Sequence, residues 1–223
     1  MKKISETNVI DIVPFKSGFI YVKKIPQDDG AFRVKFLGYD TKRMENAPVT
    51  KSVYLLSKFG PSFEIISEKL GDYATCDAGV LANKYVVVVY PTGEMGVFDD
   101  KATLVWTGDL QYKENLVQSL AVDGNNIWCC VPNQNSIIEY SITNKKVSMR
   151  IGGDNSTAFS NPVAIVKYDD ELFVTNKDSC KVRIVSLKDY SVRDFRLFDE
   201  PVYRYIQTCG KEVVLLESGI YVL

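Results

Sequence analysis

The chain has 223 residues, of which 46% are hydrophobic and 25% are charged, and its net charge is −1. This is the composition of a globular protein that can bury a core. It excludes a membrane-spanning helix, since no stretch approaches 18 uninterrupted apolar residues. It also disfavours nucleic acid as a partner, because the sequence contains no long run of basic residues.

The cysteines and the N-terminus both suggest a cellular location. Residues 1–15 start with basic residues but lack the apolar segment of a signal peptide. The five cysteines form no C-x-x-C pair, which suits free thiols in a reducing compartment. We expect a cytoplasmic protein in which Cys129, Cys180 and Cys209 are buried or half-buried on or beside strands.

A pattern of two apolar runs joined by a short polar turn occurs five times along the chain. The second run of each copy is anchored at Phe19, Tyr85, Ile127, Leu172 and Val213, so the last four anchors are 42, 45 and 41 residues apart. The turns fall at 16–18, 82–84, 123–126, 169–170 and 209–212. They are rich in residues that favour tight hairpins. Further apolar runs follow at 102–106, 145–151 and 190–197.

Short strands that recur every 41 to 45 residues predict a β-propeller with one blade per copy. No 11-residue window shows helical periodicity. A two-layer all-β sandwich is the alternative, but it does not predict so regular a spacing. We therefore expect an all-β fold in which residues 1–223 form a single domain of about five four-stranded blades.

The spacing is irregular at one place, because Phe19 and Tyr85 are 66 residues apart. We interpret the additional length as an extended insertion around residues 40–52. The alternative is a degenerate sixth blade built from "VYLLS" at 53–57 and "FEIIS" at 63–67. The last copy ends after three strands, so residues 2–5 are expected to add its outer strand and close the ring.

One stretch resembles a known repeat. Residues 150–187 contain "IGG", then "F-x-N-P-V-A-I-V", "D-D-E-L-F-V-T-N" and "V-R-I-V". This pattern resembles the NHL-type repeat over residues 114–198, although Val131 and Asn176 stand where that repeat usually carries Asp. The resemblance implies a β-propeller, and such propellers are mostly binding platforms with a few enzymes among them.

Catalytic groups are scarce in this sequence. The chain has no histidine, so it cannot form a Ser-His-Asp triad, a His-ligated zinc site or an imidazole general base. The acid pairs 28–29, 99–100 and 169–170 are expected to face solvent in turns, and residues 151–157 lack the lysine of a phosphate-binding loop. Cys129 and Cys130 are expected to point to opposite faces of one strand. We thus expect no catalytic residue, metal ligand or cofactor motif.

Candidate binding residues come from position rather than from motifs. In a propeller, the loops from second to third strands and the crossings between blades gather on one face, over the central channel, and such loops often carry function. The residues expected there are Asn133, Gln134, Asn176, Lys177, Asp178, Glu217, Tyr112, Tyr203 and Arg204.

The sequence is compatible with two classes of function. The first is a non-catalytic binding or scaffolding module that recognises a peptide, a protein or a glycan on one face, with no nucleic acid or membrane as partner. The alternative is a carboxylate-dependent glycosidase or lyase with its site in the channel. That enzyme would need two acids within about 5 to 10 Å, at least one with a perturbed pKa.

Overall fold

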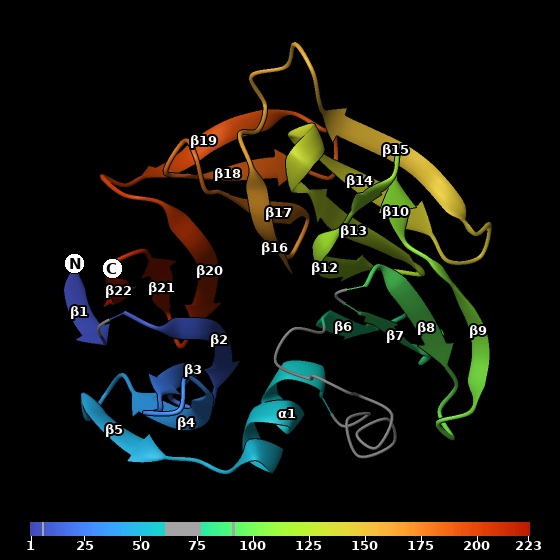
Figure 1. The fold of residues 1–223 in the computed structure, drawn as a ribbon. Helices are drawn as coiled ribbons and strands as arrows, with labels where there is room; N and C mark the ends of the chain where they lie inside the picture. The colour runs from blue at the N-terminus through green and yellow to red at the C-terminus, as the bar shows by residue number, and fades with distance from the viewer. Residues whose placement is uncertain (6, 61–76, 91) are drawn as a thin grey trace.

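A computed structural model of the chain describes residues 1–5, 7–60, 77–90 and 92–223. These residues form five four-stranded antiparallel sheets arranged in a ring (Figure 1). The protein is a five-bladed β-propeller, as the repeats predicted.

Blades 1 and 2 come from the first half of the chain. Blade 1 is built from β2 (Val9–Phe15), β3 (Gly18–Pro26), β4 (Phe32–Asp40) and β5 (Glu45–Pro48). Blade 2 is built from β6 (Asp77–Val80), β7 (Val86–Val89), β8 (Glu94–Phe98) and β9 (Leu104–Asp109). A small hairpin of β10 (Gln111–Tyr112) and β11 (Asn115–Leu116) leads from blade 2 to blade 3.

Blades 3 and 4 contain the most regular copies of the repeat. Blade 3 is built from β12 (Gln118–Asp123), β13 (Asn126–Val131), β14 (Ser136–Ser141) and β15 (Lys146–Gly152), with a short 3-10 helix η2 (Pro132–Gln134) between β13 and β14. Blade 4 is built from β16 (Pro162–Tyr168), β17 (Glu171–Asn176), β18 (Lys181–Ser186) and β19 (Val192–Leu197).

Blade 5 joins the two ends of the chain. Its strands are β20 (Val202–Thr208), β21 (Lys211–Leu216), β22 (Gly219–Val222) and, at the outer edge, β1 (Lys2–Ser5). Lys2 pairs with Val222 and Lys3 with Tyr221 in antiparallel register. The closure of the ring by residues 2–5 is therefore confirmed, and it covers the edge of β22 that would otherwise be open.

The additional length after blade 1 contains a helix. Residues 45–48 of the expected insertion pair with β4 as the outer strand of blade 1. Helix α1 (Lys51–Phe59) follows, where the Thr50 side chain accepts a hydrogen bond from the Val53 N–H and Gly60 ends the helix at φ 71°. The segment "VYLLS" is thus helical and not a strand of a sixth blade, while "FEIIS" lies outside the described residues.

The core lies between adjacent blades. Cys129 packs in a cluster with Val89 and Met95 of blade 2, whereas Cys130 packs with Ile165 and Val174 of blade 4. The two neighbouring cysteines therefore face opposite sides of β13, as expected from the alternation of a strand. Burial raises the pKa of both thiols.

The other cysteines differ in exposure. Cys180 is half-buried, but Cys209 is exposed, contrary to expectation, because it occupies the tight turn between β20 and β21 at φ 50°. The four described cysteines are free thiols. The cytoplasmic location expected from them stays a prediction.

Candidate functional site

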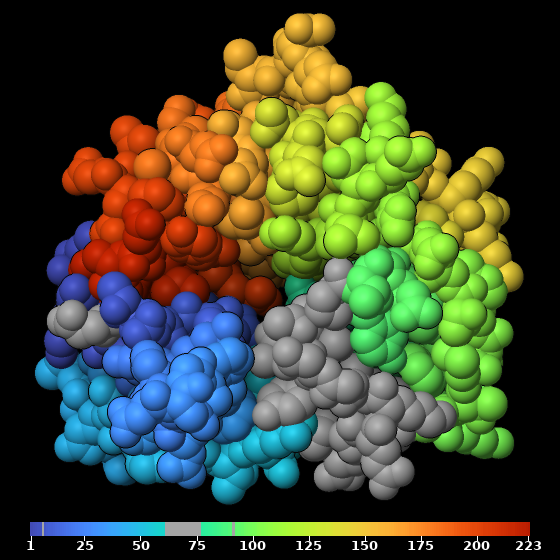
Figure 2. Space-filling view, in the orientation of Figure 1, coloured from blue at the N-terminus to red at the C-terminus, as the bar shows by residue number. Residues whose placement is uncertain are grey.

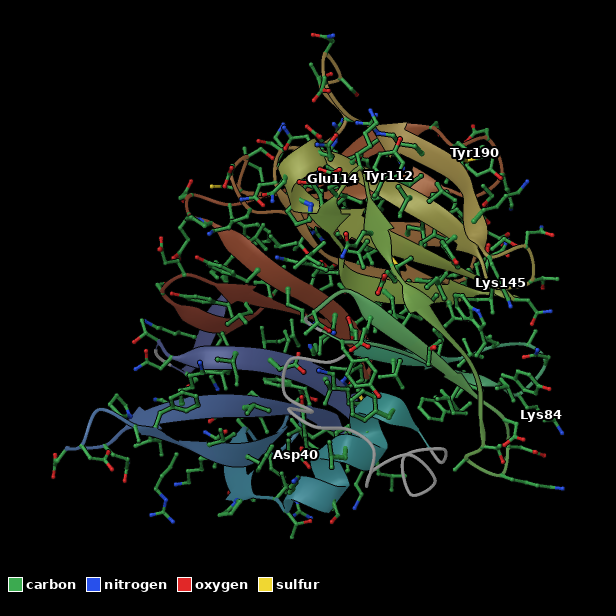
Figure 3. All side chains as sticks on the ribbon, turned by 45° about the vertical axis from the view of Figure 1, so that its right-hand side comes forward. Asp40, Lys84, Tyr112, Glu114, Lys145 and Tyr190 are labelled. Atoms are coloured by element: carbon green, nitrogen blue, oxygen red, sulfur yellow. The ribbon has the colours of Figure 1, made fainter. Side chains whose placement is uncertain are left out.

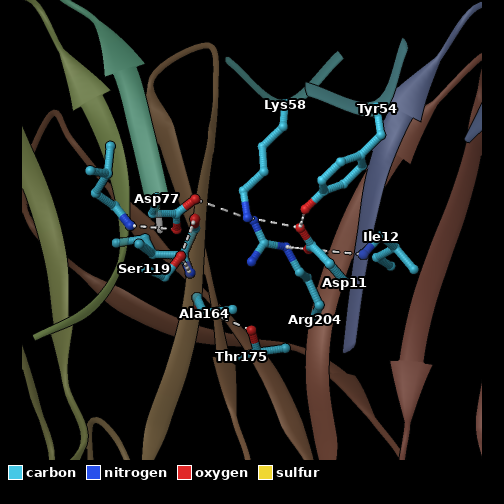
Figure 4. A network of polar contacts seen from close by, with 11 residues as sticks. Asp11, Ile12, Tyr54, Lys58, Asp77, Ser119, Ala164, Thr175 and Arg204 are labelled. Carbon is cyan, nitrogen blue, oxygen red and sulfur yellow. Dashed lines mark hydrogen bonds and ion pairs between the residues drawn. The ribbon is translucent and has the colours of Figure 1, made fainter. Parts of the chain in front are cut away.

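Five inner strands, β2, β6, β12, β16 and β20, surround the centre of the ring, and helix α1 packs against β2 and β6. Polar side chains from several of these elements meet in the channel (Figure 4). The charged members of this cluster are Asp11 of β2, Lys58 of α1, Asp77 of β6 and Arg204 of β20.

Asp11 is the most enclosed of these groups, with 1% of its surface exposed. Its Oδ2 accepts a hydrogen bond from the Tyr54 hydroxyl at 2.7 Å and lies 3.0 Å from Lys58 Nζ. Its Oδ1 accepts the backbone N–H of Ile12 at 2.9 Å and lies 3.3 Å from Arg204 Nε. Both carboxylate oxygens are therefore fully engaged.

The charge of Asp11 is fixed by these contacts. Burial alone would raise the pKa of this carboxyl group, but the positive charges of Arg204 and Lys58 and the hydrogen bond from Tyr54 outweigh burial and hold the pKa below its ordinary value. Asp11 is consequently an ionised partner and not a proton donor. An acid that protonates a leaving group needs the opposite shift, a raised pKa.

Arg204 lies between the two acids (Figure 4). Besides the contact of Nε with Asp11, its Nη2 lies 3.8 Å from Asp77 Oδ1. Burial alone would lower the pKa of this guanidinium group. The negative charges of Asp11 and Asp77 outweigh burial and hold the pKa above its ordinary value. The Oδ2 atom of Asp77 accepts the backbone N–H of Leu120 at 3.1 Å, which links blade 2 to blade 3.

Two cavities lie along the channel. The larger, of about 410 Å³, is lined by the first residues of several inner strands and by ends of the adjoining loops; we call it the mouth cavity. Its lining includes Ile10, Asp11, Lys24, Lys58, Asp77, Tyr90, Gln118, Ser119, Val163 and Arg204.

The second cavity, of about 160 Å³, is lined by residues further along the same strands, such as Pro14, Val166 and Ile206. Lys58, Asp77 and Arg204 line both cavities and so form the partition between them. In the space-filling view the molecule is hollowed near the centre of the ring (Figure 2).

Of the nine residues expected on the loop face, only Arg204 lines the mouth cavity. Tyr203 and Glu217 line a separate hollow of about 150 Å³ beside residues 7–9. Lys177 joins this group, because its Nζ lies 5.2 Å from the centroid of the Tyr203 ring.

Three further expected residues lie near hairpin β10–β11 or at the loop after β13. The guanidinium of Arg150 lies 5.3 Å from the Tyr112 ring centroid, and its Nη2 donates to the Gln134 carbonyl at 3.4 Å. Asn133 is exposed. Figure 3 labels Tyr112 and Glu114 of this hairpin.

The last two expected residues make structural contacts. Asp178 accepts a hydrogen bond from Asn161 Nδ2 at 3.0 Å. Asn176 was expected in a loop but is the last residue of β17 and is fully buried. Its Oδ1 accepts from the Ser160 N–H and its Nδ2 donates to the Val174 carbonyl, so it is out of reach of a surface ligand.

The paired acids are turn formers, as expected. Asp29 accepts the Ala31 N–H, and Asp99 accepts those of Lys101 and Thr103. Sequence reasoning passed over Asp11, which has a visible signal: it is the one acid inside the apolar run "VIDIVPF". A charge in such a run has to be paired when the strand is buried.

Two classes of site find no support in the described part of the chain. No group of three or more His, Cys, Asp or Glu side chains within it could hold a metal ion. No helix within it is long and apolar enough to cross a bilayer.

Comparisons with known proteins place the fold. No family model matches the chain, and no curated protein matches it, so the specific NHL-type repeat is not confirmed. Solved structures do match. The match to a streptogramin B lyase structure has 12% sequence identity and a TM-score of 0.52, and it covers 95% of this chain and 63% of the chain in that structure. The likeness is one of fold.

Two other propeller structures match similarly. The match to the structure of U3-55K has 8% sequence identity and a TM-score of 0.53, and it covers 98% of this chain and 61% of that chain. The match to the WD40 repeats of RRP9 has 8% identity and a TM-score of 0.50, and it covers 94% of this chain and 58% of that chain. The chain thus spans about three fifths of the length of these structures.

Proposed function

We propose that this protein is a non-catalytic binding module whose ligand site is the mouth cavity. One observation supports this most directly: a cavity of about 410 Å³ lies at the end of the channel where the strand-connecting loops gather. Cavities of roughly 300 to 1,000 Å³ with a few converging polar groups are the usual sites of ligand binding. The fold alone does not name a function.

The state of the Asp11 carboxylate favours binding over catalysis. A carboxylate-dependent glycosidase or lyase needs an acid that keeps its proton near neutral pH. Asp11 has a lowered pKa and both of its oxygens are engaged by four partners. These contacts make Asp11 a fixed element of the cavity wall, which a binding module can use and a proton-transfer enzyme cannot.

The partner is proposed to be a peptide, a protein or a glycan that projects one group into the mouth cavity. Lys24 and Gln118 belong to its lining and are not fully buried. Both are therefore suited to direct contact with a partner, and neither takes part in the ion-pair cluster around Asp11. Substitution at such positions usually changes stability by less than about 0.5 kcal/mol.

The experiment is to screen the purified protein against peptide and glycan arrays and to measure each hit by calorimetry. A Lys24→Ala/Gln118→Ala variant should weaken binding of a true hit at least about tenfold, since interface residues that matter cost more than about 1 kcal/mol. The matched control is Lys211→Ala/Gln111→Ala, which removes the same two side-chain types outside the mouth cavity and should leave binding unchanged.

Equal loss in both variants, or no loss in either, would contradict the mouth cavity as the site. Turnover of an array compound that disappears with Asp77→Asn would replace the binding module with the enzyme.

A further inference from the structure

Among the residues that the structure describes, the lining of the mouth cavity carries more positive than negative charge. Its charged members there are three cations, Lys24, Lys58 and Arg204, and two anions, Asp11 and Asp77. The net charge of this described lining is therefore +1, although the whole chain carries −1. A single negative charge from a ligand would balance it.

The two acids leave little room to accept hydrogen bonds from a ligand. Asp11 receives two hydrogen bonds and two cations on its two oxygens. Asp77 uses Oδ2 for the Leu120 N–H, and its Oδ1 lies 3.8 Å from Arg204 Nη2. A ligand that donates hydrogen bonds, such as an amine, therefore finds the acceptors of Asp11 already in use and meets the positive charge of Arg204 beside Asp77 Oδ1.

Donors, in contrast, remain available on Arg204. A guanidinium group carries five N–H donors in a planar fork that matches a carboxylate. The ion pairs of Arg204 use Nε and Nη2, the latter at 3.8 Å, which exceeds hydrogen-bond distance. Its Nη1 has no hydrogen-bonding partner within the described parts of the chain, and 25% of the side chain is exposed.

Lys24 supplies a second cation at the same cavity. Its Nζ lies 4.2 Å from the centroid of the exposed Phe32 ring, and no acidic partner engages it among the residues that the structure describes. Unlike Lys58, which is held by Asp11, Lys24 is thus free to approach an anion.

We propose that the mouth cavity binds a carboxylate group, with Arg204 as the principal donor and Lys24 as the second cation. This rests on the proposed function and names the chemistry of its ligand. The lining accommodates one negative charge; a doubly charged phosphate would leave a charge facing Asp11 and Asp77 uncompensated. The carboxylate belongs either to a small organic acid or to an acidic residue of a polypeptide.

The test is an NMR titration of the intact protein with paired probes. N-acetylglutamate methylamide carries one carboxylate, N-acetylglutamine methylamide has the same shape without charge, and butyrate represents a small acid with a single carboxylate. The charged probe should shift the amide signals of Gln118, Ser119 and Val163 with a Kd of about 1 mM, as expected for its size. The neutral probe should bind at least about tenfold more weakly, because it lacks the charge–charge attraction.

A charge-placement variant provides the second arm. Gln118→Glu adds a carboxylate to the lining of the mouth cavity and should weaken binding of the charged probe about tenfold. Gln111→Glu makes the same change in net charge outside that lining and should change the Kd less than twofold. Tighter binding of butyrate than of the blocked glutamate identifies a small acid as the source, and the reverse order identifies an acidic residue.

Three outcomes overturn the carboxylate proposal. Equal shifts of the amide signals with the charged and neutral probes would show that the mouth cavity binds a ligand whether or not the ligand carries a carboxylate. This result would leave the proposed function intact. Absence of any shift at the mouth residues with both acids at about 10 mM, or equal effects of Gln118→Glu and Gln111→Glu, would remove the site itself.

Discussion

Asn176 and Asn133 both lie near the end of a second strand, yet the structure gives them different surroundings. Asn176 takes the same place in β17 that Val131 takes in β13, and both are fully buried. Its amide group forms two hydrogen bonds to the backbone. Asn133, two residues after Val131, is exposed within η2.

We predict that Asn176→Ala lowers the free energy of unfolding by about 1–3 kcal/mol, because it removes the two hydrogen bonds that this buried amide group forms with the Ser160 N–H and the Val174 carbonyl. Asn133→Ala should change it by less than about 0.5 kcal/mol. Chemical denaturation followed by tryptophan fluorescence measures both. Similar losses from the two substitutions would contradict the structural role assigned to Asn176.

This difference shows where sequence-based reasoning stops at the residue scale. The repeat predicted that the loop begins at Asn176, whereas the structure includes Asn176 in β17 as its last residue. This difference of one residue decides whether the side chain is buried in a strand or exposed in a loop. Of the expected binding residues, Arg204 alone reaches the mouth cavity, because strand β20 places it there, and not because it belongs to a crossing loop.

At the scale of elements, strands were predictable and the helix was not. Every described strand pair except β1–β22 joins strands that follow one another in the sequence, so alternation of apolar residues and the turn between runs specify it. Helix α1 has only nine residues, and a helix this short depends on packing of Tyr54, Leu55 and Phe59 against the core between blades 1 and 2. That packing is formed by residues distant in the sequence, so "VYLLS" reads equally well as a strand.

Strand β1 supports a prediction about ring closure. Deletion of residues 2–5 exposes the edge of β22, so we expect a lower melting temperature and a higher tendency to aggregate. Differential scanning calorimetry and light scattering measure the two effects.

A transplanted strand is the control for that deletion. Residues 2–5 attached after Leu223 through an Asn-Gly turn can form a hairpin with β22 in the same antiparallel pairing. This variant should recover most of the lost stability. Failure to recover it would mean that the N-terminal residues stabilise the ring by another route than pairing with β22.

At the scale of the whole molecule, the channel cluster joins elements that are far apart in sequence. Asp11 of blade 1 contacts α1 through Tyr54 and Lys58 and blade 5 through Arg204, and Arg204 approaches Asp77 of blade 2. Sequence analysis could not assemble this cluster, since its members share no motif and the geometry arises only when the ring closes. The isolated acid in "VIDIVPF" was the single local sign of it.

We predict that Asp11→Asn destabilises the protein by about 3–5 kcal/mol at pH 7, because it leaves Lys58 and Arg204 without their buried counter-charge. The folded-state pKa of Asp11 is lowered, so its contribution is fully present above the unfolded value of about 3.9 and is lost as pH falls through the folded value. The difference between the two proteins should therefore shrink below about pH 4.

Urea denaturation at several pH values measures this difference. Asp154→Asn, which changes an exposed acid, serves as the matched control and should cost less than about 0.5 kcal/mol. A difference between wild type and Asp11→Asn that stays constant down to about pH 2 would contradict the proposed linkage.

The partition formed by Lys58, Asp77 and Arg204 has a kinetic consequence. Because these side chains lie between the mouth cavity and the smaller cavity beyond it, a ligand in the mouth cavity exchanges with solvent through the opening on the loop face. Anything seated over that opening slows arrival and departure by the same factor, which leaves the affinity unchanged. A large partner docked on the loop face would therefore lengthen the residence time of a small ligand already inside, without touching it.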